Sequence, residues 1–411
     1  MFFFRNGSDS GSSDPFLIEE RNDDSENSYS GDFDFHHPHH RHKDHNNGRY
    51  FVLFGIYSLL IVTIVVIRVP NKRNTPTKPS IPREPPPVKV FLMVGQSNMQ
   101  GHGYIDRVDD DGHHYNGTLP WMVQTYPETY GKLQQPDGNW TIRKDVWVTY
   151  NREHYLDVHN HVGQYGPLYP GYGGDPGDQD QQMGPELGFG WTLAESLNGP
   201  KQEQQILLLK LAWGGRSLAV NFRPPSSGGT TGLYYEAVIA NTYKILAQFG
   251  LFFPEFDGRY ELAGLAWHQG WNDGCDVNMT AEYEYNLANF IRDVRRDLNV
   301  PQLPVVIAVS GFQGYEPDHG RRDAIVEAQF AVANATKYPE FAGNVQSVDT
   351  RGFKRDPLPA SPGTQGYHWN NNCETYWLIG EAMAKSMLQM LSNKQNQYHG
   401  HHGVVETTKL S

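Results

Sequence analysis

Cysteine and basic charge are both scarce in this chain of 411 residues. The two cysteines, Cys275 and Cys373, are too few for a disulfide scaffold or for a zinc site built from cysteines. The formal net charge is -12 at pH 7, whereas a nucleic-acid partner requires a basic patch or stripe. The composition therefore argues against nucleic-acid binding. With 42 glycines and 27 prolines, it indicates a loop-rich globular body instead.

Apolar residues are scarce at both ends of the chain. Residues 1–49 are rich in Ser, Asp, Asn and His, and they cannot bury enough apolar surface to offset the entropy of ordering. We therefore predict a disordered polar tail there, and a second polar tail over residues 392–411. A histidine run at residues 36–42 has the composition of a metal-binding tract. Its proline and its lack of a scaffold prevent a fixed ligand geometry, so we predict no metal site.

Charge is absent from residues 50–67, which are almost entirely apolar. About 18 to 20 such residues span a bilayer as a helix, and a helix of a soluble core is rarely apolar on every face. We predict one transmembrane helix over residues 50–69. Residues 70–87, which include Pro-Arg-Glu-Pro-Pro-Pro, are predicted to form a stiff stem that holds the following body off the membrane.

The orientation of this predicted span depends on its flanking sequence. Basic residues lie on both sides, so the positive-inside rule does not decide it. Glycosylation sequons follow the span at Asn116, Asn139, Asn278 and Asn334, and only one precedes it, at Asn6. We therefore expect a single-pass, type II membrane glycoprotein whose C-terminal domain is lumenal or extracellular.

Residues 88–391 have the pattern of an α/β domain. The apolar run that begins at Val88 and stops at Gly95 is typical of a buried strand in a parallel sheet. Further strands are predicted at residues 205–212, 262–268, 305–310 and 345–348, between helices at 183–197, 234–249, 281–298, 323–337 and 375–391. Residues 104–182 are predicted to form irregular loops over one end of the sheet. Strands that alternate with helices predict a parallel sheet covered on both faces.

Polar clusters follow the predicted strands or precede the last helix, at residues 95–98, 214–217, 268–273 and 366–369. In a doubly wound sheet, such clusters converge on one crevice at the carboxyl ends of the strands. Taken alone, Ser97 is equally well explained as a helix cap or as a nucleophile. The clusters together supply a serine, histidines, an aspartate and amide donors, which are the parts of acyl transfer through a serine. Together, the clusters favour the interpretation of Ser97 as a nucleophile over that of a helix cap.

These clusters carry a specific family resemblance. Residues 91–101, Phe-Leu-Met-Val-Gly-Gln-Ser-Asn-Met-Gln-Gly, resemble the nucleophile block of the sialate O-acetylesterase-like, or carbohydrate acetylesterase, family of SGNH (GDSL-type) hydrolases. Residues 213–218, 267–270 and 366–368 resemble the later blocks of that family, in the same order. The resemblance covers about residues 88–391. It implies a three-layer αβα, flavodoxin-like sandwich that removes O-acetyl groups from carbohydrates without a cofactor.

By position, the resemblance makes Ser97 the nucleophile and His368 the general base. The oxyanion hole would consist of the backbone of Ser97, Gly215 and the side chain of Gln269. Some predicted substrate contacts lie nearby: Asn98, Arg216 and Trp271. Ordinary structural roles stay open for Arg216 and Trp271.

The sequence leaves three alternatives for the acid that supports His368. Many relatives have Glu where this chain has Trp271, and others have Asp where it has Gln365. Asp273 is the first choice because its loop should reach the crevice. Asp349 is the second choice, and a Ser–His dyad is the third.

The two cysteines immediately follow the presumed acid and base loops. If the body is lumenal, its compartment permits disulfides. We therefore expect a bond between Cys275 and Cys373 that ties the two loops together around Ser97.

The resulting prediction is a membrane-anchored serine esterase that acts on acetylated sialic acid or acetylated polysaccharide. Two alternatives remain. A carbohydrate-binding module on a degenerate hydrolase fold would explain the missing acid, and a sugar O-acyltransferase would follow if residues 104–182 exclude water from the site.

Overall fold

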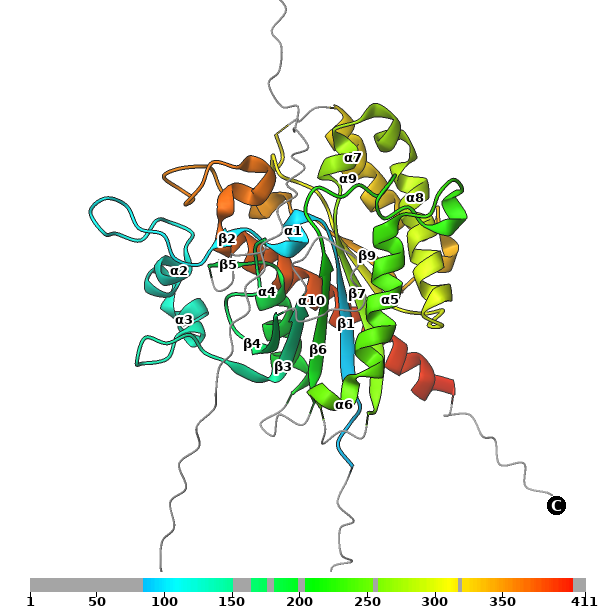
Figure 1. Ribbon diagram of the computed structural model, residues 1–411, viewed down its shortest axis with the longest axis horizontal. Coiled ribbons are helices and arrows are strands. Elements are labelled where there is room, and N and C mark those ends of the chain that lie inside the picture. The colour runs from blue at the N-terminus through cyan, green and yellow to red at the C-terminus, as the bar shows by residue number, and fades with distance from the viewer. Residues whose placement is uncertain are drawn as a thin grey trace, which may run out of the picture. The chain divides into compact units, whose positions relative to one another are not determined.

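A seven-stranded sheet organises the described part of the chain, in the order β4-β3-β6-β1-β7-β8-β9 (Figure 1). Its strands are β1 (Val88–Gly95), β3 (Arg143–Tyr150), β4 (Gln164–Leu168), β6 (Ile206–Ala212), β7 (Tyr260–His268), β8 (Val305–Ala308) and β9 (Val345–Val348). Neighbouring strands are parallel except for β3 and the edge strand β4, which are antiparallel. The short strands β2 (Gly103–Tyr104) and β5 (Gln182–Met183) form a separate antiparallel pair.

The structure is a computed structural model that describes residues 84–150, 164–175, 181–198, 204–253, 258–316 and 320–401. The predicted N-terminal tail, the predicted transmembrane helix at 50–69 and the stem up to residue 83 lie outside the described residues. Within the described ranges, no helix has both the length and the apolar character needed to cross a membrane.

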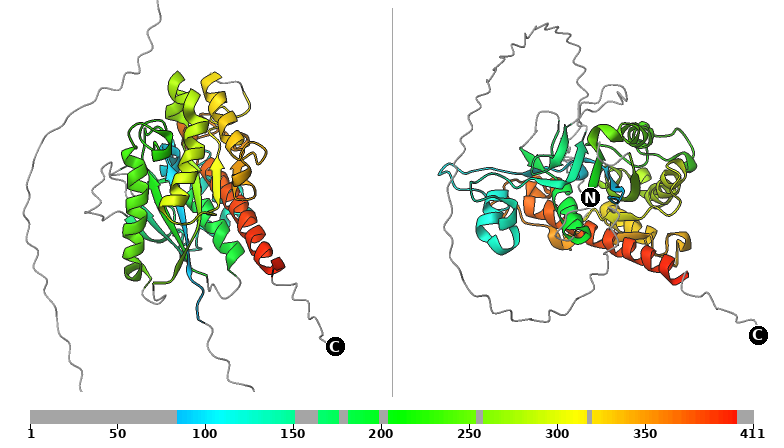
Figure 2. Two further views of the ribbon diagram at one scale, coloured as in Figure 1. Left: turned by 90° about the vertical axis from the view of Figure 1, so that its right-hand side faces the viewer. Right: turned by 90° about the horizontal axis from the view of Figure 1, so that it is seen from below.

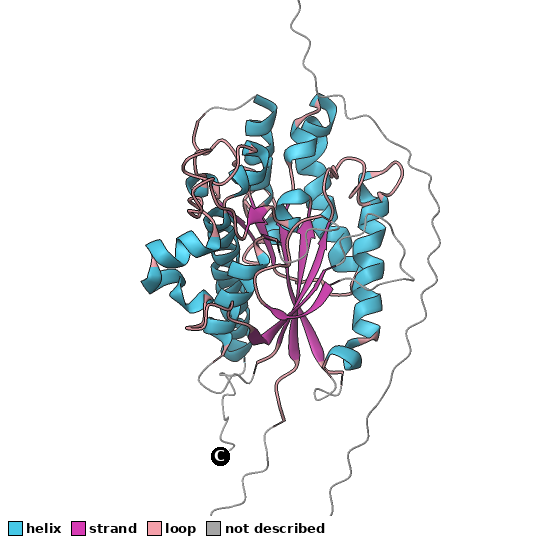
Figure 3. Cartoon of the chain, turned by 60° about the vertical axis from the view of Figure 1, so that its left-hand side comes forward, coloured by secondary structure: helices cyan, strands magenta, loops and turns pink. Residues whose placement is uncertain are grey.

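Helices cover both faces of the sheet (Figures 2 and 3). One face carries α4 (Glu186–Leu197) and α10 (Cys373–His401), and the other carries α5 (Leu233–Ala247), α8 (Val277–Asp297) and α9 (Gly320–Val332). Short helices lie in the connections: α1 (Ser97–Gln100), α2 (Leu119–Thr125), α3 (Pro127–Tyr130), α6 (Phe249–Phe252) and α7 (Trp271–Gly274).

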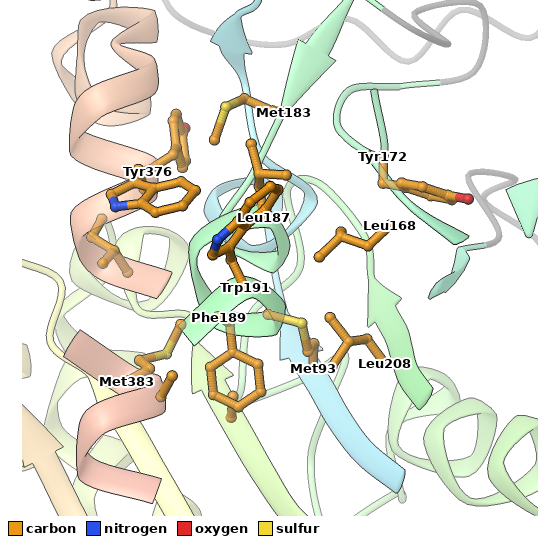
Figure 4. Close-up of a cluster of buried hydrophobic side chains, with 14 of the residues drawn as sticks. Met93, Leu168, Tyr172, Met183, Leu187, Phe189, Trp191, Leu208, Tyr376 and Met383 are labelled. Carbon is orange, nitrogen blue, oxygen red and sulfur yellow. The ribbon is translucent and has the colours of Figure 1, made fainter. Parts of the chain in front are cut away.

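The central strand β1 contributes to both cores. Phe91 and Met93 belong to the hydrophobic cluster on the α4 and α10 side, whereas Val90 and Leu92 belong to the cluster on the opposite face. Figure 4 shows the first cluster, where Met93 lies among side chains from α4, α10, β4 and β6. A strand buried on both faces is apolar at nearly every position, which explains why β1 was predictable from the sequence.

The strands and helices predicted over residues 183–391 are confirmed, with ends displaced by a few residues. The prediction for residues 104–182 was wrong where the chain forms β3 and β4. Strand β3 pairs in parallel with β6, from Val146 beside Ile206 to Tyr150 beside Lys210. Its first three residues are Arg, Lys and Asp, so only its second half has the pattern of a strand. Helix α10 continues to His401, so the first part of the predicted polar tail at residues 392–411 is helical.

Candidate active site

Ser97 begins α1 directly beyond the carboxyl end of β1 and is 7% exposed. The N-cap residue of this helix is Gln96, and no side chain provides a capping hydrogen bond. The helix-cap alternative for Ser97 is therefore wrong. The hydroxyl has the position expected of a nucleophile at the edge of a parallel sheet.

The end of β1 is fixed between its two neighbouring strands. Gly95 O accepts a hydrogen bond from Trp213 N at 3.1 Å, and Gln96 N donates to His268 O at 3.2 Å. A Cβ atom on Gly95 would lie 2.1 Å from His268 O, so only glycine permits this approach. Ser97 thus follows a rigid junction.

Gln96 and Asn272 connect the loops that follow β1, β6 and β7. Gln96 Oε1 accepts from the N–H groups of Gly270 at 3.2 Å and Asn272 at 3.4 Å, and Gln96 Nε2 donates to Asn272 Oδ1 at 3.2 Å. Asn272 Nδ2 donates to Gly215 O at 2.7 Å. Gly215 has a φ of 66°, in the left-handed region that favours glycine. This network places Gly215 and Asn272 beside the loop of the nucleophile.

Asp273 is buried and binds the backbone of a neighbouring loop. Its carboxylate accepts hydrogen bonds from Leu218 N at 2.8 Å, Ala219 N at 2.9 Å and Gln269 Nε2 at 2.6 Å. Burial raises the pKa of Asp273 to about 6, although these hydrogen bonds oppose the rise. The assignment of Asp273 as the triad acid is therefore wrong. Its carboxylate fixes the loop that carries Gly215.

The Gln269 amide is also occupied. Besides the bond to Asp273, Gln269 Nε2 donates to Arg216 O at 3.1 Å. An amide nitrogen has two hydrogens, and both are engaged here. The predicted oxyanion role of Gln269 was wrong for this reason. Asn272 Nδ2, with one bond to Gly215 O, retains a hydrogen for a ligand.

His368 lies in the 3₁₀ segment η6 (Gly366–Asn371), where Gln365 orients its ring. His368 Nδ1 lies 3.2 Å from Gln365 Oε1. Because an amide oxygen only accepts, Nδ1 carries the proton and Nε2 is left as the base. Asp349, the second candidate for the acid, forms an ion pair with Arg351 at 2.7 Å. Among the described residues no carboxylate bonds to His368, so the arrangement is closest to the predicted Ser–His dyad.

The ring of His102 stacks on the ring of His368. The two centroids are 4.0 Å apart and the planes differ by 11°. Burial, and after it the His102 charge, lower the pKa of His368 to about 2. The His368 ring is therefore neutral at physiological pH, which is the form a general base requires.

Asn98 ties the loop of His368 to the loop of Ser97. Its Nδ2 donates to Tyr367 O at 2.8 Å, and its Oδ1 accepts from the Tyr376 hydroxyl at 2.7 Å. Asn98 is 1% exposed, so the predicted substrate contact is replaced by a structural role. No hydrogen bond joins the described Ser97 hydroxyl and His368 ring, and catalytic hydrogen bonds often tighten only when substrate binds.

Aromatic rings extend from His368 toward the end of β8. The Tyr367 ring lies 4.6 Å from the His368 ring and 5.4 Å from Trp271, which is 5.4 Å from Phe312. The Arg322 guanidinium covers one face of Trp271, 3.8 Å from the ring centroid. That face is closed to a sugar, whereas Tyr367 is 39% exposed next to the base.

The remaining polar groups have structural contacts. The Arg216 guanidinium lies over the Tyr234 ring at 4.8 Å, and its predicted substrate contact stays a prediction. His268 is fully buried, with Nδ1 3.1 Å from Ala308 O, and burial lowers its pKa to about 4. In the described ranges no group of three or more His, Cys, Asp or Glu side chains is placed to hold a metal ion.

The predicted disulfide was wrong, because both cysteines are free thiols. Cys275 is exposed at the end of α7, whereas Cys373 is buried at the start of α10 and donates to Tyr104 O at 3.0 Å. Proximity in sequence to two loops of one site does not bring the two sulfur atoms together.

Sequence reasoning missed the roles of Gln96, His102, Asn272 and Gln365. Gln96 and Asn272 lay inside clusters already recognised, but nothing in the sequence showed that their amides bond to one another. Gln365 was noted only as the absence of an acid, although an amide oxygen at that position still orients the ring. His102 gave no signal, since stacking depends on the fold.

Comparison with known proteins identifies the class of enzyme that this site belongs to. A family model described as carbohydrate esterase, sialic acid-specific acetylesterase, matches residues 87–389. The chain belongs to this family, which consists of carboxylic ester hydrolases.

Individual relatives are more distant. The chain is 24% identical over 284 residues to a probable carbohydrate esterase of Arabidopsis thaliana, covering 67% of this chain and 84% of that protein. Similar solved structures include an Arabidopsis thaliana protein at 18% identity (TM-score 0.46, 74% of this chain and 98% of that chain). NanS is similar at 13% identity, with a TM-score of 0.43, and the match covers 76% of this chain and 99% of NanS. A carbohydrate acetylesterase from Xanthomonas citri is similar at 14% identity, with a TM-score of 0.42, and the match covers 74% of this chain and 56% of that chain.

Proposed function

We propose that this protein is a serine O-acetylesterase of SGNH type that removes acetyl groups from carbohydrates through an acetyl-enzyme on Ser97. The observation that carries the proposal is the junction of two loops far apart in sequence. Asn98, next to the nucleophile, bonds to the backbone of Tyr367, and His102 stacks on the base that follows it. These contacts support a site that contains both the serine and a neutral histidine, in a chain that belongs to a carbohydrate esterase family.

The first half of the reaction forms the acetyl-enzyme. Ser97 Oγ attacks the carbonyl carbon of the acetyl ester while His368 Nε2 takes the hydroxyl proton. The N–H groups of Ser97 and Gly215, together with Asn272 Nδ2, stabilise the negative oxygen of the tetrahedral intermediate. The bond from the carbonyl carbon to the sugar oxygen then breaks, and His368 returns the proton to that oxygen.

The second half releases acetate. A water molecule attacks the acetyl carbon, and His368 Nε2 takes a proton from it. When the intermediate collapses, the bond to Ser97 Oγ breaks and His368 protonates the serine. Gln365 Oε1 holds Nδ1–H through both halves, so Nε2 always faces the reacting groups. An amide cannot balance the imidazolium charge as a carboxylate would.

The membrane anchor and the glycans remain part of the proposal. The predicted span at residues 50–69 would attach the esterase domain to a membrane, with the domain on the lumenal or extracellular side. Among the described sequon asparagines, Asn139, Asn278 and Asn334 are exposed, which supports glycosylation at these positions.

The test is acetate release by the full-length protein in detergent from acetylated xylan, acetylated glucomannan and O-acetylated sialic acid. Ser97→Ala should lower kcat/KM by about a thousandfold or more, whereas Ser196→Ala, at an exposed position of α4, should have no effect. A serine-reactive phosphonate should label Ser97. Full activity of Ser97→Ala would refute the mechanism, and absence of both labelling and acetate release would favour the carbohydrate-binding module. Transfer of acetate to an added sugar would identify an acyltransferase.

A further inference from the structure

A cavity of about 310 Å³ lies beside the aromatic group that borders His368. It is formed by the loop after β8, one side of α9, and the 3₁₀ segment η5 (Arg351–Phe353). Its volume falls at the lower end of the range for ligand sites. The lining residues that matter here are Tyr315, Glu316, Arg322, Asp323, Glu327 and Arg351.

This cavity adjoins the catalytic histidine through shared aromatic walls. Phe312 and Arg322 line the cavity, and both contact the Trp271 ring. Trp271 also contacts Tyr367, whose ring contacts His368. A chain of sugar units bound at the base could therefore continue over the exposed Tyr367 ring toward the cavity, with Trp271 as the wall between them.

The charges in the cavity select against anions. Glu316, Asp323 and Glu327 are exposed and, within the described ranges, make no hydrogen bond or ion pair. Of the two guanidinium groups, Arg351 is neutralised by a two-point ion pair with Asp349, with N···O distances of 2.7 and 2.9 Å. The three carboxylates therefore exceed the cations, so a sugar that carries a carboxylate is repelled.

The same carboxylates suit a neutral sugar. Hydroxyl groups donate to carboxylate oxygens in charge-assisted hydrogen bonds. Tyr315 is 69% exposed, and the Arg351 guanidinium lies 4.9 Å from its ring centroid. An aromatic ring held in this way offers an apolar surface for the face of a sugar ring, next to acceptors for its hydroxyl groups.

We propose that this cavity is a subsite for a neutral, unacetylated sugar unit that follows the acetylated unit at Ser97. The preferred substrate is then an acetylated neutral oligosaccharide or polysaccharide and not a single acidic sugar. This inference rests on the proposed esterase function, because that function places the acetylated unit at Ser97. The cavity and its charges can be tested without any esterase activity.

Binding of unacetylated sugars tests the subsite without any catalysis. Xylotetraose, cellotetraose, mannotetraose and, as the anionic comparison, tetragalacturonic acid are titrated calorimetrically into the full-length protein in detergent. At least one neutral tetrasaccharide should bind, and tetragalacturonic acid should bind at least tenfold more weakly. Tyr315→Ala should raise the Kd of the neutral sugar tenfold or more and leave p-nitrophenyl acetate hydrolysis unchanged. The matched control is Tyr243→Ala, which removes a half-exposed tyrosine near the end of α5 and should leave the Kd unchanged.

A charge variant separates recognition from simple stacking. Asp323→Asn combined with Glu327→Gln should raise the Kd of the neutral sugar. It should also reduce the ratio between the Kd of tetragalacturonic acid and the Kd of the neutral sugar. Failure of every neutral tetrasaccharide to bind a protein that hydrolyses p-nitrophenyl acetate would overturn the subsite and leave the esterase proposal intact. An unchanged Kd in Tyr315→Ala would also overturn it. Binding that depends on Tyr315, in a protein without esterase activity, would support the sugar site and refute only the esterase chemistry.

Discussion

The Nδ1 atom of His368 lies 3.2 Å from the Oε1 atom of Gln365, so an amide occupies the place where a serine hydrolase usually has an acid. The amide fixes the tautomer and the orientation of the ring. In the proposed mechanism, the amide cannot compensate the positive charge that develops on the imidazole during proton transfer. The His368 ring is therefore oriented as it would be by an acid, but in the proposed mechanism its positive charge lacks the electrostatic stabilisation that a carboxylate gives.

Gln365→Glu should raise the esterase activity of this site. Glutamate has the same length as glutamine, so a carboxylate would replace the amide at Nδ1 and stabilise the imidazolium. We expect kcat/KM to rise roughly tenfold, and the acid limb of the pH profile to move to higher pH because the pKa of His368 rises. The measurement is kcat/KM for p-nitrophenyl acetate across pH. Gln365→Leu is the control and should lower activity, since nothing would then hold Nδ1–H. Equal profiles for all three proteins would show that Gln365 does not orient the base.

His102→Ala should expose His368 to water. Burial is the main cause of the low pKa of His368, and the stacked ring provides part of that burial. Removing the ring should raise the pKa of His368 toward its ordinary value of 6.5. The acid limb of kcat/KM, absent near that pH in the native protein, should then appear. His114→Ala is a suitable control, because His114 pairs with Asp106 instead. An acid limb that does not move would contradict a role for the stack.

Asp273→Asn tests the pH dependence of stability. The pKa of Asp273 is raised from 3.8 to about 6 in the folded protein, so the folded state binds this proton more tightly than the unfolded state. The stability that the protonated carboxyl contributes is complete below pH 3.8 and is lost as pH rises through about 6. The free energy of unfolding of the native protein, relative to Asp273→Asn, should therefore fall between these pH values.

The same variant has a constant cost at every pH. Asn has an acceptor for only some of the three donors that meet the Asp273 carboxylate, so about 1–3 kcal/mol of stability should be lost above pH 7. Denaturant unfolding of both proteins between pH 4 and 8 measures the two effects. A difference in unfolding free energy that does not vary with pH would show that the pKa of Asp273 is not raised.

The fold was largely predictable because β1, β6 and β7 are apolar at nearly every position and end at polar clusters. The roles of Ser97, Gly215 and His368 were expected from the family resemblance of the polar clusters, and hydrogen bonds connect the loops that carry these residues. The partners of each polar atom were not predictable. Asp273 and Asp349 were chosen as acids by their place after strands, but one bonds to backbone N–H groups and the other to Arg351. The hydrogen-bond partner of each polar atom depends on the geometry of the loops. The pattern of apolar and polar residues in one sequence does not predict that geometry.

Lys210 holds the helix that begins with the proposed nucleophile, and replacing Lys210 should lower both stability and activity. Its ammonium group on β6 is fully buried, pairs with Glu186 at 2.7 Å and donates to the backbone oxygens of Gln100 and Tyr172. Gln100 is the last residue of α1, so the buried pair fixes the far end of the helix that begins with Ser97. Lys210→Met leaves the carboxylate of Glu186 buried without its partner, and we expect a loss of about 3–5 kcal/mol in the free energy of unfolding.

The double variant Lys210→Met with Glu186→Leu is the decisive comparison for this pair. It removes both charges, so its unfolding free energy should lie closer to that of the native protein than that of Lys210→Met does. Its kcat/KM should nevertheless stay reduced, because no ammonium group then holds Gln100 O and the helix of Ser97 is free to shift. Recovery of both stability and activity in the double variant would show that Lys210 serves the fold alone. Recovery of stability without activity would establish Lys210 as a positioning residue for the nucleophile.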